Sequence, residues 1–395
     1  MSQRDFSVYI HVPFCAQKCP YCDFNTYATN VIPEQEYVES LLAELQWHAA
    51  NTVQRGREVA TVFFGGGTPS LLASTSIAKI IDTINQLFGI KAGAEISMEA
   101  NPTSVSSDTY RALLGAGINR VSFGVQSFDD AHLARLGRDH SAEQAKKAIM
   151  IAHDVGILRT SVDLMFGVPE QTVEALERDV AIATSLPITH LSAYALSIEP
   201  GTPFFQRRER GLLTLPVEGE VVKMLDALPD LLSAKGFTRY EISNYAVPGY
   251  ESAHNTVYWE GGDYLGLGAG AHSFFVSDTD SNVGAVRSSN VALPATYMKS
   301  VSDGRMVSWR ERLDEDALCY EFFYLGLRMM KGVSYRDFCE RFTPDKWSAY
   351  EPAICDLIEG GLLQRSGDRV SLTKRGIAIS DSVFEQLIVD KGDID

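Results

Sequence analysis

The chain has 395 residues, 45% of them hydrophobic and 22% charged, with a formal net charge of −16. This composition predicts a globular protein with one large domain and a smaller one. The acidic balance disfavours a nucleic acid partner, because a phosphate backbone requires a basic surface. No apolar run reaches the about 18–20 residues that span a bilayer, and the start, MSQRDFSVYIHV, does not resemble a signal peptide. We therefore expect a cytoplasmic protein without a transmembrane segment.

Short β-rich runs alternate with longer helical patterns over the first half of the chain. This alternation is typical of parallel βαβ units. Six units precede residue 200, fewer than the eight of a closed barrel, which predicts an open or partial α/β barrel with its ligand site at the carboxyl ends of the strands. The expected strands are 7–12, 60–66, 95–100, 120–126, 159–167 and 190–197, and the expected helices are 34–49, 76–89, 107–117, 142–156 and 172–186.

A second, mostly helical region is expected after a polar linker, the Gly-, Ser- and Asn-rich segment 277–294. We place the domain boundary after residue 290, which divides the chain into 1–290 and 291–395. The region contains three helical patterns, a short hairpin at 362–373 and a final helix at 374–388. This order resembles a winged helix, and its few basic residues favour a structural or docking role over DNA binding.

Three closely spaced cysteines, Cys15, Cys19 and Cys22, form the most distinctive motif. Thiolates at this spacing can hold three corners of a [4Fe–4S] cluster and leave the fourth iron open for chemistry. A zinc site would need a fourth ligand nearby, and His11 is expected to have another role. The remaining cysteines are scattered and read as small buried hydrophobes, so a reducing compartment fits the sequence.

Polar residues follow the later strands where the carboxyl ends of a parallel sheet converge. A glycine run, Gly65 to Gly67, allows close approach of a ligand but lacks the sequel of a P-loop. Glu99, Gln126 and Asp163 lie on successive strands, and Arg138 follows with a forked donor suited to a carboxylate. Each residue alone could instead have a purely structural role, as a helix cap or as one partner of a surface ion pair. Together they suit a ligand with an ammonium group, a carboxylate and a ribose.

These motifs resemble those of the radical S-adenosylmethionine (SAM) superfamily. The wider set YIHVPFC, FFGGGTPS, SMEANP, RVSFGVQSF, LGRDH and VDLMFGVP is similar to the oxygen-independent coproporphyrinogen III oxidase family over nearly the whole chain. The resemblance implies a partial (β/α)6 barrel and an open cluster iron that chelates the amino and carboxylate groups of SAM. It also implies a set of SAM contacts: Tyr9, Gly66, Gly67, Thr68, Glu99, Gln126, Arg138 and Asp163.

Three features resemble the HemW branch of this family, whose members are described as haem chaperones. Phe24 stands where the oxidases have a fourth cysteine, the oxidases have a longer N-terminal extension, and the chain carries an HNxxYW motif. Neutral histidine is a common haem ligand, and the tract after His254 is rich in aromatic residues and glycine. Simple packing of the barrel rim is an equally weighted reading of this motif. The candidate haem residues are His254, Asn255, Tyr258, Trp259 and His272.

The function implied by the resemblance is a haem chaperone that uses a [4Fe–4S] cluster and SAM and passes haem to acceptor haemoproteins, including membrane respiratory enzymes. The alternative is an enzyme that decarboxylates coproporphyrinogen III with a 5′-deoxyadenosyl radical. Whether the chain cleaves SAM productively is left open at this point.

Overall fold

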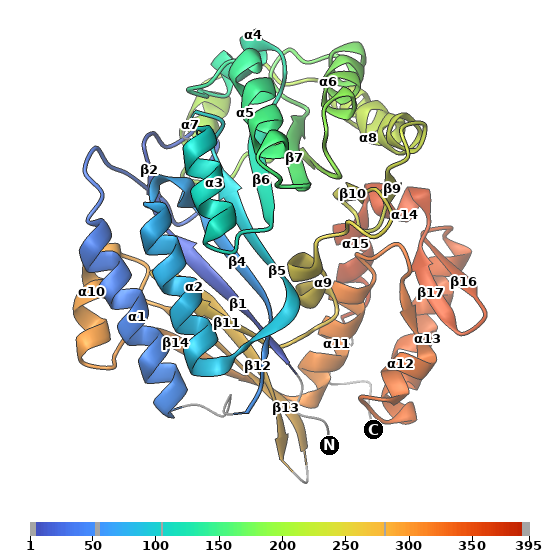
Figure 1. The fold of residues 1–395 in the computed structure, drawn as a ribbon. Helices are drawn as coiled ribbons and strands as arrows, with labels where there is room; N and C mark the ends of the chain where they lie inside the picture. Colours follow the sequence, from blue (N-terminus) through green and yellow to red (C-terminus); the bar gives the residue numbers. More distant parts are fainter. Residues whose placement is uncertain (1–4, 52–55, 104–105, 280–281, 389–395) are drawn as a thin grey trace.

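The computed structural model describes residues 5–51, 56–103, 106–279 and 282–388. Its centre is a sheet of twelve strands in the described ranges. The sheet curves so that helices line its outer side, and the helices after residue 314, orange to red, lie on the other side (Figure 1). Six neighbouring strands are parallel and follow the chain order, with an intervening helix outside the sheet after each of the first five. This is the predicted partial (β/α)6 barrel.

All the predicted units of the barrel are present. The strands are β1 (Phe6–Val12), β4 (Val59–Gly66), β5 (Ile90–Ala100), β6 (Arg120–Gln126), β7 (Arg159–Phe166) and β8 (His190–Ala195). The helices between them are α1 (Glu34–Asn51), α2 (Ser74–Phe88), α3 (Ser107–Gly115), α5 (Ala142–Asp154) and α6 (Val173–Ser185), with a short α4 (Asp130–Arg135) after β6. Two more helices follow β8, namely α7 (Pro203–Glu209) and α8 (Glu218–Ser233).

The two faces of the barrel strands differ in chemistry. Alternate residues such as Val62, Met98 and Val121 are fully buried and belong to the main apolar core. The residues between them face the interior, because side chains alternate between the two faces of a strand, and many of them are polar. Glu95, Ser97 and Glu99 on β5 are the clearest series. The strand pairing sets Ser97 beside Arg120 and Glu99 beside Ser122, so the interior is built in polar layers.

The segment predicted to be a linker is instead part of the sheet, so that prediction is wrong. Strands β12 (His272–Thr279) and β13 (Asn282–Asn290) form an antiparallel pair, and β13 pairs with β14 (Val307–Leu313). Strand β11 (Tyr264–Leu267) joins them to β1. The domain boundary after residue 290 stays a prediction. Beyond it, α10 (Pro294–Ser302) is followed by β14, which continues the same sheet.

The C-terminal region has the predicted order of helices and hairpin. It contains α11 (Glu315–Gly326), α12 (Tyr335–Cys339) and α13 (Pro344–Glu359), and then β16 (Leu363–Ser366) and β17 (Arg369–Leu372). A third strand, β15 (Val333–Ser334), pairs with β17. The expected final helix is divided at Ile379 into α14 (Lys374–Ala378) and α15 (Ser380–Glu385). An aromatic cluster of Phe323, Phe338, Trp347 and Tyr350 forms its core.

A buried carboxylate fastens helix α1 to the end of the sheet. Glu44 has no exposed surface. It accepts hydrogen bonds from Asn290 Nδ2 at 2.6 Å, Tyr297 Oη at 2.5 Å and the Gly268 amide at 2.9 Å. These donors come from β13, α10 and the turn after β11. One side chain therefore joins four parts of the fold that lie far apart in the sequence.

We expect Glu44→Ala to destabilise the protein strongly. The substitution leaves the Tyr297 hydroxyl and the Gly268 amide without this acceptor and removes one of the two acceptors of Asn290 Nδ2. Removing one partner of such a network costs about 3–5 kcal/mol. Urea unfolding of the ligand-free protein measures the change. Glu39→Ala is the matched control, because Glu39 lies on the same helix and is exposed. Equal unfolding midpoints for the two variants would contradict this role of Glu44.

Candidate functional site

Each cysteine of the predicted cluster motif has a hydrogen-bonding partner. Cys15 ends the short strand β2 (Phe14–Cys15) and accepts from Thr68 Oγ1 at 3.7 Å. Cys19 accepts from Arg138 Nη1 at 3.3 Å, and the Cys22 sulfur lies 3.8 Å from Thr26 Oγ1. Because a thiolate can only accept, all three partners can donate once the thiols are deprotonated. Such bonds tune the potential of an iron–sulfur cluster.

The cysteine loop is fastened to the sheet through His11. Its Nε2 atom lies 2.9 Å from the Asn25 carbonyl oxygen, which can only accept, so Nε2 carries the proton. Nδ1 therefore accepts from Tyr9 Oη at 3.0 Å. Asn25 in turn donates to the carbonyl oxygens of Ala269 and Ala292. This series of hydrogen bonds gives His11 a structural role, which the sequence left undefined.

The glycine run packs directly beneath this loop. A Cβ on Gly66 would lie 2.4 Å from His11 Cε1, and the backbone there has a φ of +108°, which favours glycine. A Cβ on Gly67 would lie 2.6 Å from the Phe14 carbonyl oxygen. The Gly67 and Thr68 amides donate to Val12 and Phe14. The glycines thus allow β4 to approach the cysteine loop, a packing role that leaves the predicted SAM contact of these residues open.

Two carboxyl groups lie together at the carboxyl end of the barrel. Glu99 accepts from the Gly66 amide at 3.1 Å, and Asp163 accepts from Ser122 Oγ at 3.1 Å. Burial raises the pKa of Glu99 to about 7, and the nearby Asp163 adds to this effect. Burial likewise raises the pKa of Asp163 to about 6. The pair is therefore poised to gain from a cationic ligand, which would favour the charged forms.

Gln126 and Arg138 complete the predicted set on the same side. Gln126 ends β6 with a φ of +71°, beside an irregularity in the pairing with β7. A non-glycine residue in this conformation is strained and is typical of functional sites. Arg138 spans Cys19 and the Gly124 carbonyl oxygen, to which Nη2 donates at 2.8 Å. Within the described residues its buried Nε has no partner. The structure thus brings all eight predicted SAM residues together.

A polar cavity of about 250 Å3 occupies the barrel interior below these residues. Tyr9, Glu99 and Asp163 line the end of the cavity nearer the cysteine loop, which we call its upper end. His254, Asn255 and Tyr258 of the HNxxYW motif line it from the short helix α9 (Ala253–Trp259). The motif therefore closes the end of the barrel that lies away from the cysteines.

His254 is 1% exposed, and both of its ring nitrogens are engaged. Nδ1 lies 2.7 Å from Thr61 Oγ1, and Nε2 lies 2.9 Å from Tyr258 Oη. Burial lowers the pKa of His254 to about 3, so the ring is neutral. Trp259 packs under the guanidinium group of Arg328, 4.6 Å from the ring centroid. In this conformation, His254 and Tyr258 have the contacts expected of packing residues, while the buried Trp259 Nε1 has no hydrogen-bonding partner among the described residues.

His272 lies apart from the motif at the start of β12, with its side chain exposed. Burial lowers the pKa of His11, and the proximity of His272 lowers it further, so His272 is on the side of the cysteine loop. Among the candidate haem ligands, His272 is the accessible one.

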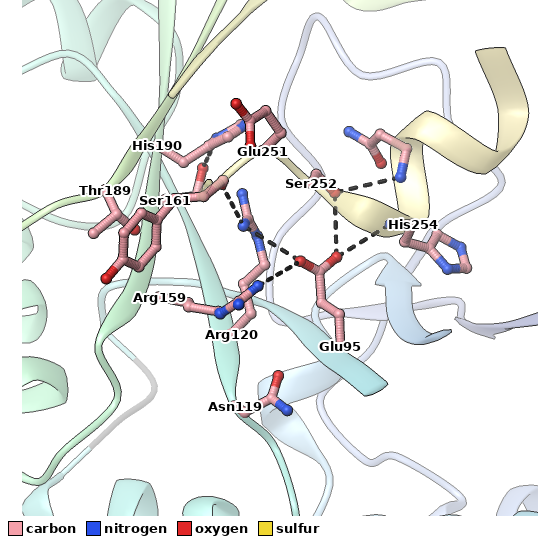
Figure 2. A network of polar contacts seen from close by, with 12 residues as sticks. Glu95, Asn119, Arg120, Arg159, Ser161, Thr189, His190, Glu251, Ser252 and His254 are labelled. Atoms are coloured by element: carbon pink, nitrogen blue, oxygen red, sulfur yellow. Dashed lines mark hydrogen bonds and ion pairs between the residues drawn. The ribbon is translucent and has the colours of Figure 1, made fainter. Parts of the chain in front are cut away.

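A buried network at the far end of the barrel was missed by the sequence reading. Figure 2 shows Glu95 bonded to the His254 amide and paired with Arg120 and Arg159. Arg120 also donates to the Tyr250 carbonyl oxygen at 2.9 Å. The network holds helix α9 against the strands. Its sequence signal is the alternation of polar residues along strands that parallel sheets normally bury on both faces.

Comparisons with known proteins agree with this geometry. The sequence model of the radical SAM superfamily matches residues 9–182, and that of the HemN C-terminal domain matches residues 313–379. A protein of Bacillus subtilis named heme chaperone HemW is 36% identical over 96% of this chain and 98% of its own length. A protein of the same name from Escherichia coli is 36% identical over 97% of this chain and 98% of its own.

The chain belongs to the HemW family. Its fold matches that of the coproporphyrinogen III oxidase HemN from Escherichia coli, with a TM-score of 0.82 over 98% of this chain and 90% of that one. At 22% identity this likeness shows the fold alone. No helix in the described ranges is long and apolar enough to cross a membrane.

The radical SAM match implies a [4Fe–4S] cluster and SAM as cofactors, and the residues present fit both. The donor set is three thiols on one loop, each with a partner able to donate to a thiolate. Burial raises the pKa of the Cys15 thiol, and the neighbouring cysteines add to this, a cost that bound iron offsets. No described group of side chains converges as the ligands of a single metal ion. A cluster instead distributes its thiolates over separate irons.

Proposed function

We propose that this protein is a haem chaperone that binds a [4Fe–4S] cluster, SAM and haem and transfers haem to acceptor haemoproteins. The full-length similarity to HemW proteins, which carry the haem-chaperone name, is the observation that supports this most. Membrane respiratory enzymes are the acceptor class that the family resemblance implies. The thiols of the cysteine loop suit a reducing compartment, the cytoplasm.

The cofactor residues would hold a cationic, carboxylate-bearing molecule against the cysteine loop. The cysteines would bind three irons, Glu99 and Asp163 would face the positive groups of SAM, and Arg138 would neutralise charge beside Cys19. When bound, the cluster and SAM supply one-electron chemistry. The interior of the barrel keeps the two carboxyl groups away from bulk water, which strengthens their interaction with a cation.

The haem site that the geometry favours is an exposed strip of the sheet around His272. The strand pairing sets His272 opposite Ser289, and Ser289 opposite Trp309, so the three side chains share a face. Trp309 is 45% exposed. The helix α11 covers this face further along, where Arg287 pairs with Glu321 at 2.8 Å. Burial and Arg287 lower the pKa of His272, which favours the neutral imidazole that haem iron takes.

We expect His272→Ala to weaken haem binding by about tenfold or more, because even the loss of a supporting residue costs metal sites this much. A haem titration followed by the Soret band measures the change. His153→Ala is the matched control, since His153 is also exposed and lies on α5 outside the barrel. Unchanged haem binding by His272→Ala would refute this placement. The chaperone function would then still be possible with haem bound at the HNxxYW motif.

A further inference from the structure

We propose that the barrel interior contains a binding site for a small aliphatic carboxylate, with Arg120 at its floor. This goes beyond the proposed haem function, because the ligand would enter the barrel rather than lie on the sheet. Arg120 is 2% exposed and lines the cavity. Within the described part of the chain, its Nη2 atom has no hydrogen-bonding partner. An unpaired buried donor is costly, so this atom is available to a ligand.

Arg120 is the charged group at the floor of the cavity. Arg120 and Arg159 both face one carboxylate, that of Glu95, at 3.4 and 3.7 Å (Figure 2). His190 lines the floor in its neutral form, since burial and the adjacent Arg120 lower its pKa. The Nη1 atom of Arg120 also donates to the Tyr250 carbonyl oxygen, so Glu95 and the backbone are bound through Nη1, and Nη2 is left for a ligand. An anionic oxygen would give Nη2 a charge-assisted partner.

Neutral polar groups lie on the strands beside Arg120. Ser161 on β7 contacts His190 Nδ1 at 2.7 Å and also lines the cavity. Ser97, which pairs with Arg120 across the strands, has a buried hydroxyl without a partner among the described residues. Their hydroxyl groups can donate to a second oxygen of the ligand, since a carboxylate oxygen only accepts. A carboxylate, which has two acceptor oxygens, matches them better than a halide does.

The polarity of the cavity reverses along its length, which orients the ligand. Glu99 and Asp163 lie at the cysteine end, and Arg120 begins β6 at the opposite end. Asp163 is two residues beyond Ser161 on the same strand, so the two ends are about 7 Å apart or more. The carboxyl pair would repel an anion at the upper end. A carboxylate would therefore lie at the floor, with its aliphatic part pointing towards the predicted SAM residues.

The size of the cavity limits the ligand. About 250 Å3 is less than the about 300–1,000 Å3 typical of sites for drug-sized ligands. A whole tetrapyrrole is too large for this cavity. The cavity therefore suits a short free acid or a single carboxylate side chain of a larger molecule.

The test uses 3,3,3-trifluoropropionate as a probe, observed by fluorine NMR with the full-length protein. We expect line broadening that unlabelled propionate reverses and that propionamide, its uncharged analogue, does not. Arg120→Gln should weaken binding at least tenfold. Arg159→Gln removes the same charge beside Glu95 from a side chain that is 41% exposed and outside the cavity lining, and it should retain binding.

Three results would overturn the proposal: no broadening with the unmodified protein, equal binding by Arg120→Gln, or equal loss in both arginine variants. Arg120 also supports the fold, so circular dichroism must accompany the titration. If Arg120→Gln does not fold, Ser161→Val decides, because it fills the floor without a change of charge and should abolish probe binding. Haem titration of the same samples is read separately, so failure here leaves the chaperone function untouched.

Discussion

Cys19→Ser should abolish iron–sulfur cluster binding. Clusters of this type are held by thiolates, which a serine hydroxyl replaces poorly, and Arg138 would lose its 3.3 Å contact with the sulfur. After anaerobic reconstitution we expect iron and sulfide contents near zero and no visible iron–sulfur absorption. SAM affinity should fall as well, since the family places the amino and carboxylate groups of SAM on the open iron.

Cys355→Ser provides the control for this experiment. Cys355 is exposed on α13, outside the cysteine loop, and should leave the cluster content unchanged. A visible iron–sulfur spectrum of normal intensity in Cys19→Ser would show that these cysteines do not hold the cluster. Loss in both variants would instead point to general damage during reconstitution.

SAM affinity should fall as the pH is lowered from 8 to 5.5. The pKa of Glu99 is raised to about 7 and that of Asp163 to about 6, mainly by burial. Below these values the carboxyl groups are protonated and no longer attract a cation. One linked proton weakens binding about tenfold per pH unit. In the ligand-free protein the sign is opposite, because raised pKa values mean that the folded state binds protons more tightly, and stability is lost as pH rises towards 7.

Glu99→Gln separates the carboxylate from other causes of this pH dependence. We expect SAM binding at pH 8 to weaken by about 2 kcal/mol, or roughly thirtyfold, as for removal of one partner of a buried charge pair. The variant should also show a shallower pH profile. Isothermal titration at several pH values measures both effects. Glu177→Gln, an exposed change on α6, should behave as the unmodified protein; an unchanged profile in Glu99→Gln would assign the titration to other groups.

The barrel could be predicted because its strands carry strong local signals. Val62, Met98 and Val121 alternate with inward residues, and turns and helices follow at regular intervals. The proximity of Glu99 and Asp163 could also be predicted, because parallel strands bring their carboxyl ends together. The predicted linker failed for the opposite reason. Strands β12 and β13 are rich in Ser, Asn and Gly, and their pairing with β14 is a tertiary interaction without a local signal.

Burial decided what the sequence left open about the histidines. His254 and His272 are equal as candidates in the sequence, but one is enclosed with both nitrogens engaged and the other is exposed. Arg120 and Glu95 lie in strands where polar residues alternate with apolar ones. That alternation is visible in the sequence and is typical of a polar barrel interior, but no site residue was predicted from it.

The central claim is tested most directly by two parallel measurements on one anaerobically reconstituted sample. The protein is incubated with coproporphyrinogen III, SAM and a reductant, and a second portion is titrated with haem. We predict haem uptake with a shift of the Soret band and no protoporphyrinogen. Formation of protoporphyrinogen over many turnovers would contradict the chaperone assignment and establish the oxidase instead.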